Sequence, residues 1–317
     1  MKGSDKMGVK YDKLFKILNE RSIPKTQLKD KLGWSSTTLA KLSKNECVSM
    51  QNIMSLCKYL NCQPGDIMEY EEDIDSNSLL YKLQEQKRMK LKGGIYHQTQ
   101  INLAYNSNHI EGSRLTEDQT RYIYETNTIG VENTPTNVDD IIETVNHFQC
   151  FDYMIDHALD TLSEDFIKSI HGILKANTSD SRLDWFKVGD YKSEPNVIGN
   201  MIETTRPENV KYEIEKILDS YLEIENVTLD NILDFHVKFE KIHPFQDGNG
   251  RVGRIIMFKE CLKYNIVPFI IEDDMKLYYY RGLKEWNNEK GYLRDTCLSA
   301  QDRYKVYLDY FKIEYNL

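Results

Sequence analysis

Residues 241–254, KIHPFQDGNGRVGR, gather side chains that can bind an anion and move a proton. Gly248, Asn249 and Gly250 permit positive φ and expose backbone N–H groups, and Arg251 opens the next apolar helical segment. Peptide N–H groups at a helix N-terminus bind phosphate through unpaired donors and the helix dipole together. The string therefore predicts a phosphate site between two helices.

Charged side chains flank these glycines. Asp247 would be repelled by a phosphate unless a cation lay between them, which predicts Mg²⁺. Arg251 and Arg254 lie three residues apart on one helical face and can donate to phosphate oxygens. His243 stands before a proline, where the preceding helix must end, and an imidazole of ordinary pKa can accept a hydroxyl proton. An Asn-Gly turn alone carries little information, so the prediction depends on the whole set.

The string fits, position by position, the signature H-P-F-x-D-G-N-G-R-x-x-R of the Fic family, and the likeness covers about residues 95–290. Fic proteins that resemble this chain transfer AMP from ATP to a protein hydroxyl. The resemblance implies that His243 is the general base for a target Ser, Thr or Tyr hydroxyl and that Asp247 holds Mg²⁺. It implies that residues 248–250 form the anion nest, while Arg251 and Arg254 hold the phosphate tail.

A β-hairpin is predicted within GDYKSEPNVIGNMIE (189–203) from its Gly, its Pro and a short Val-Ile pair. The segment resembles the family's flap, which pairs with the target as an added strand and helps to seat the nucleotide. Lys192 stands where the family more often has Arg. The resemblance places these residues near ATP: Ile198, Gly199, Asn200 and Met201.

The stretch YYYRGLKEWNN lies on a predicted helix over 276–289. It resembles the family's adenosine-contacting helix, with Tyr279, Tyr280 and Asn287 as the candidate contacts. Packing within the helical body is the alternative for the two tyrosines.

A second short motif, NSNHIEGS (106–113), places Ser107 and Glu111 four residues apart on one helical face, before the helix-stopping Gly112. It resembles the family's autoinhibitory motif in the form of an N-terminal helix, here near 95–112. The resemblance implies that Glu111 pairs with Arg254 where the γ-phosphate of ATP should lie, so that bound ATP is misaligned and transfer is slow. The same glutamate could orient a water for AMP removal.

Residues 1–70 read as short helices, and two of them, separated by a tight turn at Gly33, form a helix-turn-helix pattern. The segment resembles the Cro/CI-type repressor domain. This resemblance implies DNA binding, in which a dimer would compensate for the few phosphate contacts of one domain. The alternative is a helical packing domain with a solvated basic face. The residues expected to face base edges and phosphates are Ser36, Thr37, Thr38 and Lys41.

Charge separates the chain into two parts. Residues 1–70 hold 12 Lys/Arg against 7 Asp/Glu, whereas the chain as a whole has a net charge of −9. A basic first part on an acidic body predicts that only the first part meets a polyanion. Helical patterns dominate the remainder, so we predict a mainly α protein with a helix-turn-helix domain (1–70), a linker and bridging helix (71–94) and an all-helical Fic domain with a β-hairpin flap (95–317).

The remaining patterns favour an enzyme of the cytoplasm. No apolar run approaches the roughly 20 residues of a membrane span, and no secretory signal is visible. The six cysteines are scattered without zinc spacing, which favours reduced thiols. We therefore expect a protein adenylyltransferase that uses ATP and Mg²⁺, acts on a protein substrate or on itself, and binds DNA through its first domain. A transcription regulator with a nucleotide-sensing pocket, an AMP-removing enzyme and transfer of another nucleotide monophosphate remain alternatives.

Overall fold

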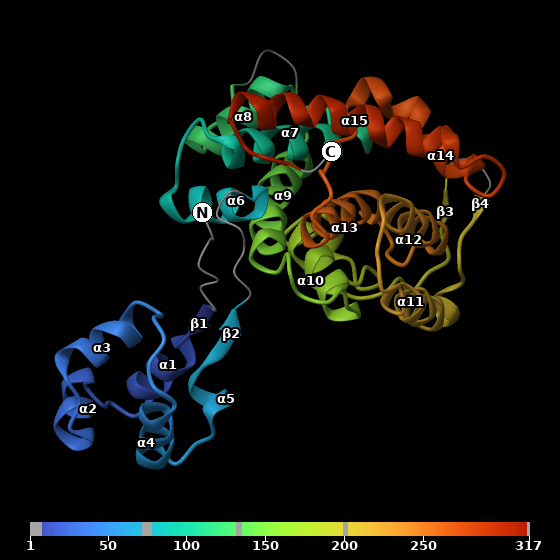
Figure 1. Ribbon diagram of the computed structural model, residues 1–317. Helices are drawn as coiled ribbons and strands as arrows, with labels where there is room; N and C mark the ends of the chain where they lie inside the picture. The colour runs from blue at the N-terminus through green and yellow to red at the C-terminus, as the bar shows by residue number, and fades with distance from the viewer. Residues whose placement is uncertain (1–7, 72–77, 131–134, 199–201, 316–317) are drawn as a thin grey trace. The chain divides into compact units, whose positions relative to one another are not determined.

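The computed structural model describes residues 8–71, 78–130, 135–198 and 202–315. The chain divides into two compact units, Met1–Asp75 and Ser76–Leu317 (Figure 1). This division falls inside the acidic stretch 69–78, where the sequence lacks apolar periodicity.

The first unit is a helical domain around its own apolar core. Leu14, Leu28 and Leu56 are almost fully enclosed, and Trp34 is 8% exposed at the edge of the same core. Gly33 ends one helix in the left-handed conformation with φ 66°, as the turn requires. The elements are β1 (Gly8–Lys10), α1 (Asp12–Glu20), α2 (Lys25–Leu32), α3 (Ser36–Ser43), α4 (Met50–Leu60), α5 (Pro64–Ile67) and β2 (Glu69–Glu71).

The pairing of β1 with β2 was not predicted. The two strands are antiparallel, with Val9 opposite Tyr70, and so join the two ends of the first unit. Each strand has three residues, which is too short for an alternating pattern to be visible in the sequence.

The second unit is helical, apart from one short hairpin, in the residues that the structure describes (Figure 1). This confirms the predicted mainly α fold. Its elements are α6 (Leu79–Met89), α7 (Ile95–Ile110), α8 (Glu117–Thr126), α9 (Val138–Asp156), α10 (Glu164–Leu174), β3 (Val197–Ile198), β4 (Ile202–Glu203), α11 (Pro207–Leu222), α12 (Leu229–Ile242), α13 (Asn249–Lys263), α14 (Lys276–Glu285) and α15 (Gly291–Tyr310).

Helix α13 lies at the centre of this unit and is packed against α7, α9, α10 and α12. Thirteen of its fifteen residues are buried, including both arginines near its N-terminus. A helix covered on every side has no polar face, which explains why the sequence of α13 lacks an amphipathic stripe. Its N-terminus is thereby fixed by four neighbouring helices.

Helix α14 is shorter than the sequence predicts, and α6, predicted as a bridging helix, packs within the second unit. The predicted helix 276–289 ends at Glu285, and Asn287 lies in the turn that follows. Helix α6 belongs to the second unit, because Lys87 donates to the carbonyl of Asp152 on α9 at 2.8 Å. Within the described residues, no helix combines the length and the apolar character needed to cross a bilayer.

Candidate active site

The loop between α12 and α13 is held by its own side chains. The Phe245 N–H donates to Oδ1 of Asn249 at 2.8 Å, and Nδ2 of Asn249 donates back to the Phe245 carbonyl at 2.9 Å. The Phe245 ring stacks on His171 of α10, with centroids 3.9 Å apart. Gly248 has φ 82°, and α13 begins directly after it. The loop is thus rigid, and the N-terminus of α13 offers unpaired N–H donors.

The two glycines of the loop serve different purposes. Only Gly248 has a positive φ, whereas Gly250 is already helical and α13 starts two residues earlier than predicted. A Cβ on Gly250 would stand 2.2 Å from Oε1 of Glu111 and 2.9 Å from Nη1 of Arg254. Gly250 is therefore needed for close approach, and the group that approaches it is the Glu111 carboxylate.

Ser107 and Glu111 both contact Arg254, the partner that the family resemblance implies for Glu111. Nη2 of Arg254 lies 2.7 Å from Oε1 of Glu111 and donates to the Ser107 carbonyl at 2.9 Å, while Nε donates to Oγ of Ser107 at 3.0 Å. Arg254 is 4% exposed, and Glu111, at the end of α7, is 31% exposed. Burial would lower the pKa of Arg254, but the charges of Glu111, Tyr279 and Glu240 together outweigh it and raise the pKa. A carboxylate of the chain itself therefore occupies one donor of Arg254, on Nη2.

A closed ring of four charges lies beside the same loop. Nζ of Lys175 contacts Oε1 of Glu143 at 2.5 Å and Oδ2 of Asp247 at 2.7 Å. Arg251 pairs with Oε2 of Glu143 and, at 3.1 Å, with Oδ2 of Asp247. Partial burial would raise the pKa of Asp247, but Arg251 and Lys175 outweigh it and hold the pKa well below its usual range. Asp247 is therefore ionised at neutral pH.

Asp247 is suited to bind a magnesium ion together with a nucleotide. Its ion pairs in the described residues use Oδ2, and half of its side-chain surface remains exposed. No cluster of three or more His, Cys, Asp or Glu side chains in the described ranges could hold a metal alone. Mg²⁺ typically takes one or two carboxylates and completes its shell with water and substrate phosphates. A single exposed carboxylate next to an anion cradle fits that requirement.

His243 ends α12 in the left-handed conformation, with φ 52°. Its Nδ1 lies 3.3 Å from the Glu240 carbonyl, so a proton on Nδ1 faces that oxygen and Nε2 is left as an acceptor. Burial lowers the pKa of His243, and Lys192 adds to this effect. The imidazole is therefore neutral at pH 7 and able to take a proton.

Lys192 ties the hairpin segment to the loop. Its backbone N–H donates to the Pro244 carbonyl at 2.9 Å, and its Nζ contacts Oδ1 of Asn196 and Oγ1 of Thr204, both at 2.6 Å. Burial lowers its pKa to about 8. The predicted hairpin is present as β3 and β4, with Ile198 opposite Ile202. The other predicted flap contacts, Gly199, Asn200 and Met201, lie outside the described residues.

The three candidate adenosine contacts have different environments. Tyr279 has no exposed surface and its hydroxyl lies 2.7 Å from Nε2 of His236, so it belongs to the helix packing. Tyr280 is 41% exposed, and its hydroxyl faces the Ile110 carbonyl at 3.4 Å. Asn287 is exposed in the turn after α14. Of the three, only Tyr280 and Asn287 present surface to a ligand.

Sequence reasoning missed three ionisable groups of this site. Glu143 and Lys175 close the charge ring, and Oε1 of Glu240 is buried without a partner among the described residues. Burial raises the pKa of Glu240 to about 8, with a further contribution from the charge of Glu111. Glu143 lies on α9 and Lys175 directly follows α10, and neither lies in a motif, so only the packing of helices reveals them.

The predicted DNA-contacting residues lie on α3 and its start. Ser36, Thr37 and Lys41 are exposed, whereas Thr38 is half-buried. The Thr38 N–H donates to Oγ of Ser35 at 3.2 Å, so this residue takes part in the helix cap. Three of the four side chains are thus available on one exposed face.

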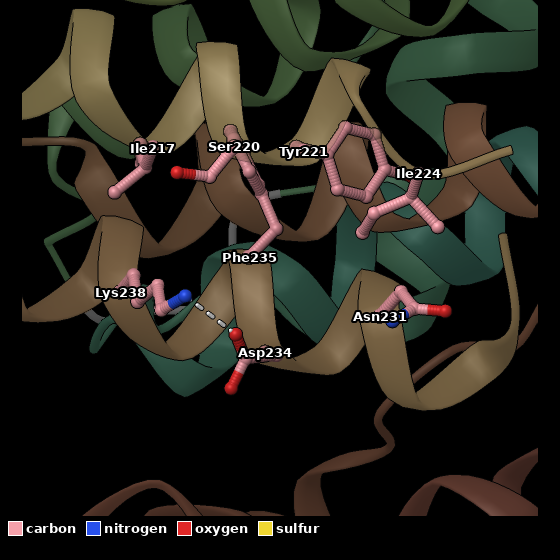
Figure 2. A pocket seen from close by; sticks show the side chains of 8 residues that line it. All are labelled: Ile217, Ser220, Tyr221, Ile224, Asn231, Asp234, Phe235 and Lys238. Carbon is pink, nitrogen blue, oxygen red and sulfur yellow. Dashed lines mark ion pairs between the residues drawn. The ribbon is translucent and has the colours of Figure 1, made fainter.

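A hollow between α11 and α12 contains none of the predicted site residues (Figure 2). Lys238 pairs with Asp234 at 2.8 Å across its floor, and Asp234 also accepts from the Trp286 indole at 2.9 Å. Ser220, Tyr221 and Asn231 bond to residues outside the hollow, so its polar side chains already have partners in the protein. The lining residues are Ile217, Ser220, Tyr221, Ile224, Asn231, Asp234, Phe235 and Lys238.

Comparison with known proteins identifies two families in the chain. The sequence model of the Fic/DOC family matches residues 161–261, which contain α10, the hairpin and the loop. The chain contains a Fic/DOC family domain. The protein adenylyltransferase fic-1 of Caenorhabditis elegans is 26% identical over 198 residues, which are 60% of this chain and 37% of that protein. The protein adenylyltransferase Fic of Nematostella vectensis is 26% identical over 194 residues, 58% of this chain and 42% of that protein. The chain thus spans about two fifths of these curated relatives.

The first unit of this Fic protein matches a different family. Residues 13–73 fit the Cro/C1-type HTH DNA-binding domain. The uncharacterized HTH-type transcriptional regulator YozG of Bacillus subtilis is 34% identical over 62 residues, which cover 74% of that protein and 19% of this chain. The family assignment predicted for each unit is therefore confirmed.

Solved structures share the fold of the Fic unit. A Fic domain containing signaling protein from Bacteroides thetaiotaomicron matches 75% of this chain and 99% of its own, with a TM-score of 0.60 and 22% identity. Residues 134–508 of Fic-1 from C. elegans match 93% of this chain and 83% of their own, with a TM-score of 0.56 and 17% identity. At such identities the likeness concerns the fold alone.

Proposed function

We propose that the chain is a protein adenylyltransferase that moves AMP from ATP to a hydroxyl of a protein substrate and that Glu111 restrains this activity. The observation that carries the proposal is the contact of Glu111 with both Gly250 and Arg254, since a carboxylate held there marks an anion site. The curated relatives named as protein adenylyltransferases support the choice of reaction.

The residues of the loop have distinct tasks in this reaction. Nε2 of His243 accepts the proton of the target hydroxyl as its oxygen bonds to the α-phosphorus and the bond to the β-phosphate oxygen breaks, releasing pyrophosphate. The N–H groups at the start of α13 and the guanidinium of Arg251 bind the phosphates. Mg²⁺ bound at Asp247 would supply positive charge to the α- and β-phosphates. Catalysis then depends on positioning and charge neutralisation.

Restraint follows from competition for Arg254. Nε and Nη2 of Arg254 are already bonded to Ser107 and Glu111, and the Glu111 carboxylate lies beside Gly250, so a γ-phosphate cannot pair with Nη2 until the carboxylate leaves. A charge-assisted hydrogen bond is worth about 1.5–3 kcal/mol, which corresponds to roughly ten- to a hundredfold in an equilibrium. ATP can still bind in this state, but with its phosphates displaced from the geometry needed for transfer.

Labelling with α-³²P-ATP tests the proposal. We expect Glu111→Gly to raise AMP incorporation into co-expressed proteins or into the chain itself by at least about tenfold, and His243→Ala to abolish it in either background. A mass increase that matches AMP on the modified residue distinguishes this reaction from transfer of another nucleotide monophosphate. Equal labelling of the parent and Glu111→Gly would remove the inhibitory role.

We further propose that the first unit binds DNA and connects the enzyme with transcription. The exposed Thr37 and Lys41 on α3, together with the Cro/C1-type match, support this role. A filter-binding or gel-shift assay with the upstream region of the protein's own gene tests it. Loss of binding in Thr37→Ala/Lys41→Ala, with folding retained, is the expected result.

A further inference from the structure

Lys175 is an unusual residue for the edge of an active site. It is 2% exposed, although its side chain carries a charge, and its ammonium is surrounded by Glu143 at 2.5 Å, Asp247 at 2.7 Å and Asp180 at 3.3 Å. Carboxylates from three segments of the chain thus create a position for a cation, and the chain fills that position itself. A buried lysine is retained only where such partners compensate its loss of hydration.

The position of Lys175 bears directly on the metal proposed at Asp247. Its Nζ shares Oδ2 of Asp247 with Arg251, so two positive groups already neutralise this carboxylate. A divalent cation that approaches the exposed side of Asp247 is repelled by both of them. ATP brings negative phosphates that offset this repulsion.

We propose that Lys175 is a positioning residue whose ammonium group permanently neutralises Asp247 and holds its carboxylate in place. It fixes the carboxylate through Oδ2, leaves the exposed side for the metal, and keeps the metal affinity low until a nucleotide is present. This inference rests on the proposed function, because it takes Asp247 as the metal ligand. It explains why Glu143 bridges Lys175 and Arg251: each oxygen of the Glu143 carboxylate holds one of the two cations, and both cations contact Oδ2 of Asp247.

The test measures metal binding without nucleotide or target. Mn²⁺ serves as the probe, and free Mn²⁺ is measured by electron paramagnetic resonance in titrations of the full chain. Lys175→Met removes the charge with little loss of length, and we expect it to bind Mn²⁺ at least about fivefold more tightly than the parent. The matched control is Lys168→Met on α10, the helix that ends just before Lys175; Lys168 pairs with Glu164 at 2.7 Å and Asp190 at 2.8 Å. The control should retain the parent affinity.

Three further variants make the result decisive. Lys175→Met/Asp247→Asn must lose the gain, and Lys175→Arg, which keeps the charge, must resemble the parent. Lys175→Gln replaces Lys175→Met if circular dichroism shows that the latter does not fold. Unchanged or weaker Mn²⁺ binding in the neutral variants, or a gain that survives in the double variant, overturns the proposal. Absence of AMP labelling would instead contradict the proposed function and leave this titration unaffected.

Discussion

Replacing Glu111 by glutamine changes one charge in the restrained site and almost nothing else. The carboxylate Oε1 lies 2.7 Å from Nη2 of Arg254, and glutamine can keep a hydrogen bond of similar length. The substitution therefore separates the charge of Glu111 from the space that it occupies near Gly250.

The expected effect can be worked out from this contact. Arg254 is 4% exposed, so water screens the pair weakly. A hydrogen bond to a charged group is worth about 1.5–3 kcal/mol. Glutamine keeps the charged donor but removes the charge of the acceptor, so Glu111→Gln should weaken the contact by part of that value, about 1–2 kcal/mol. Because 1.36 kcal/mol is a factor of ten, the ATP dissociation constant should fall by roughly five- to thirtyfold.

Isothermal titration calorimetry with ATP and with ADP at constant Mg²⁺ measures this change. The gain should appear with ATP and be small with ADP, because only the γ-phosphate competes with Glu111 for Arg254. Glu117→Gln is the matched control, since Glu117 pairs with Arg121 at 3.0 Å on the surface and should leave both affinities unchanged. An ATP affinity within twofold of the parent, or equal gains for the two nucleotides, would refute the competition between carboxylate and phosphate.

Further predictions concern pH, stability and DNA. His243 acts as a base only when its imidazole is neutral, and its pKa is lowered by burial. The transfer rate of Glu111→Gly should therefore stay constant from pH 8 to 7 and fall at lower pH, with a midpoint below about 6.5. A midpoint above pH 7 in the pH-rate profile contradicts the assignment. Lys259 is fully buried and pairs with Glu260 at 2.8 Å, so Lys259→Ala should cost about 3–5 kcal/mol in urea unfolding; a loss below 1 kcal/mol would show that the pair is dispensable. Ser35→Ala removes the cap of α3 and should cost about 1 kcal/mol in the same assay, whereas no change would mean that water replaces the hydroxyl. Lys41→Ala should lower the slope of log affinity against log salt by about one in DNA titrations, and an unchanged slope would place Lys41 away from phosphate.

The sequence predicted those parts of the protein that depend on local patterns. Amphipathic spacing predicted most helices, and α7 begins at the predicted residue 95 and ends two residues before 112. The loop residues were found because their chemistry is concentrated in a few consecutive positions. The Glu111–Arg254 contact was predicted only through the family resemblance, because 143 positions separate the two residues and no periodicity connects them.

The remainder depends on packing between distant segments. Glu143 and Lys175 are 32 residues apart and meet only because α9 packs on α10. The burial of Tyr279 shows that it packs within the protein. The sequence could not predict this, because a tyrosine on a helix has the same pattern whether it faces a ligand or a histidine. The β1–β2 pair was missed for the opposite reason, because three-residue strands carry too little pattern to recognise.

Helix α7 limits how the restraint on the active site can be released. Twelve of its sixteen residues are buried, so swinging the whole helix away would expose much of the interior and cost far more than the contact at its end. Glu111 follows the last helical turn and precedes Gly112, whose φ is 103°. Movement of the final turn alone therefore costs the least free energy. A signal that switches the enzyme on needs to reach only the few residues around Glu111 and Gly112.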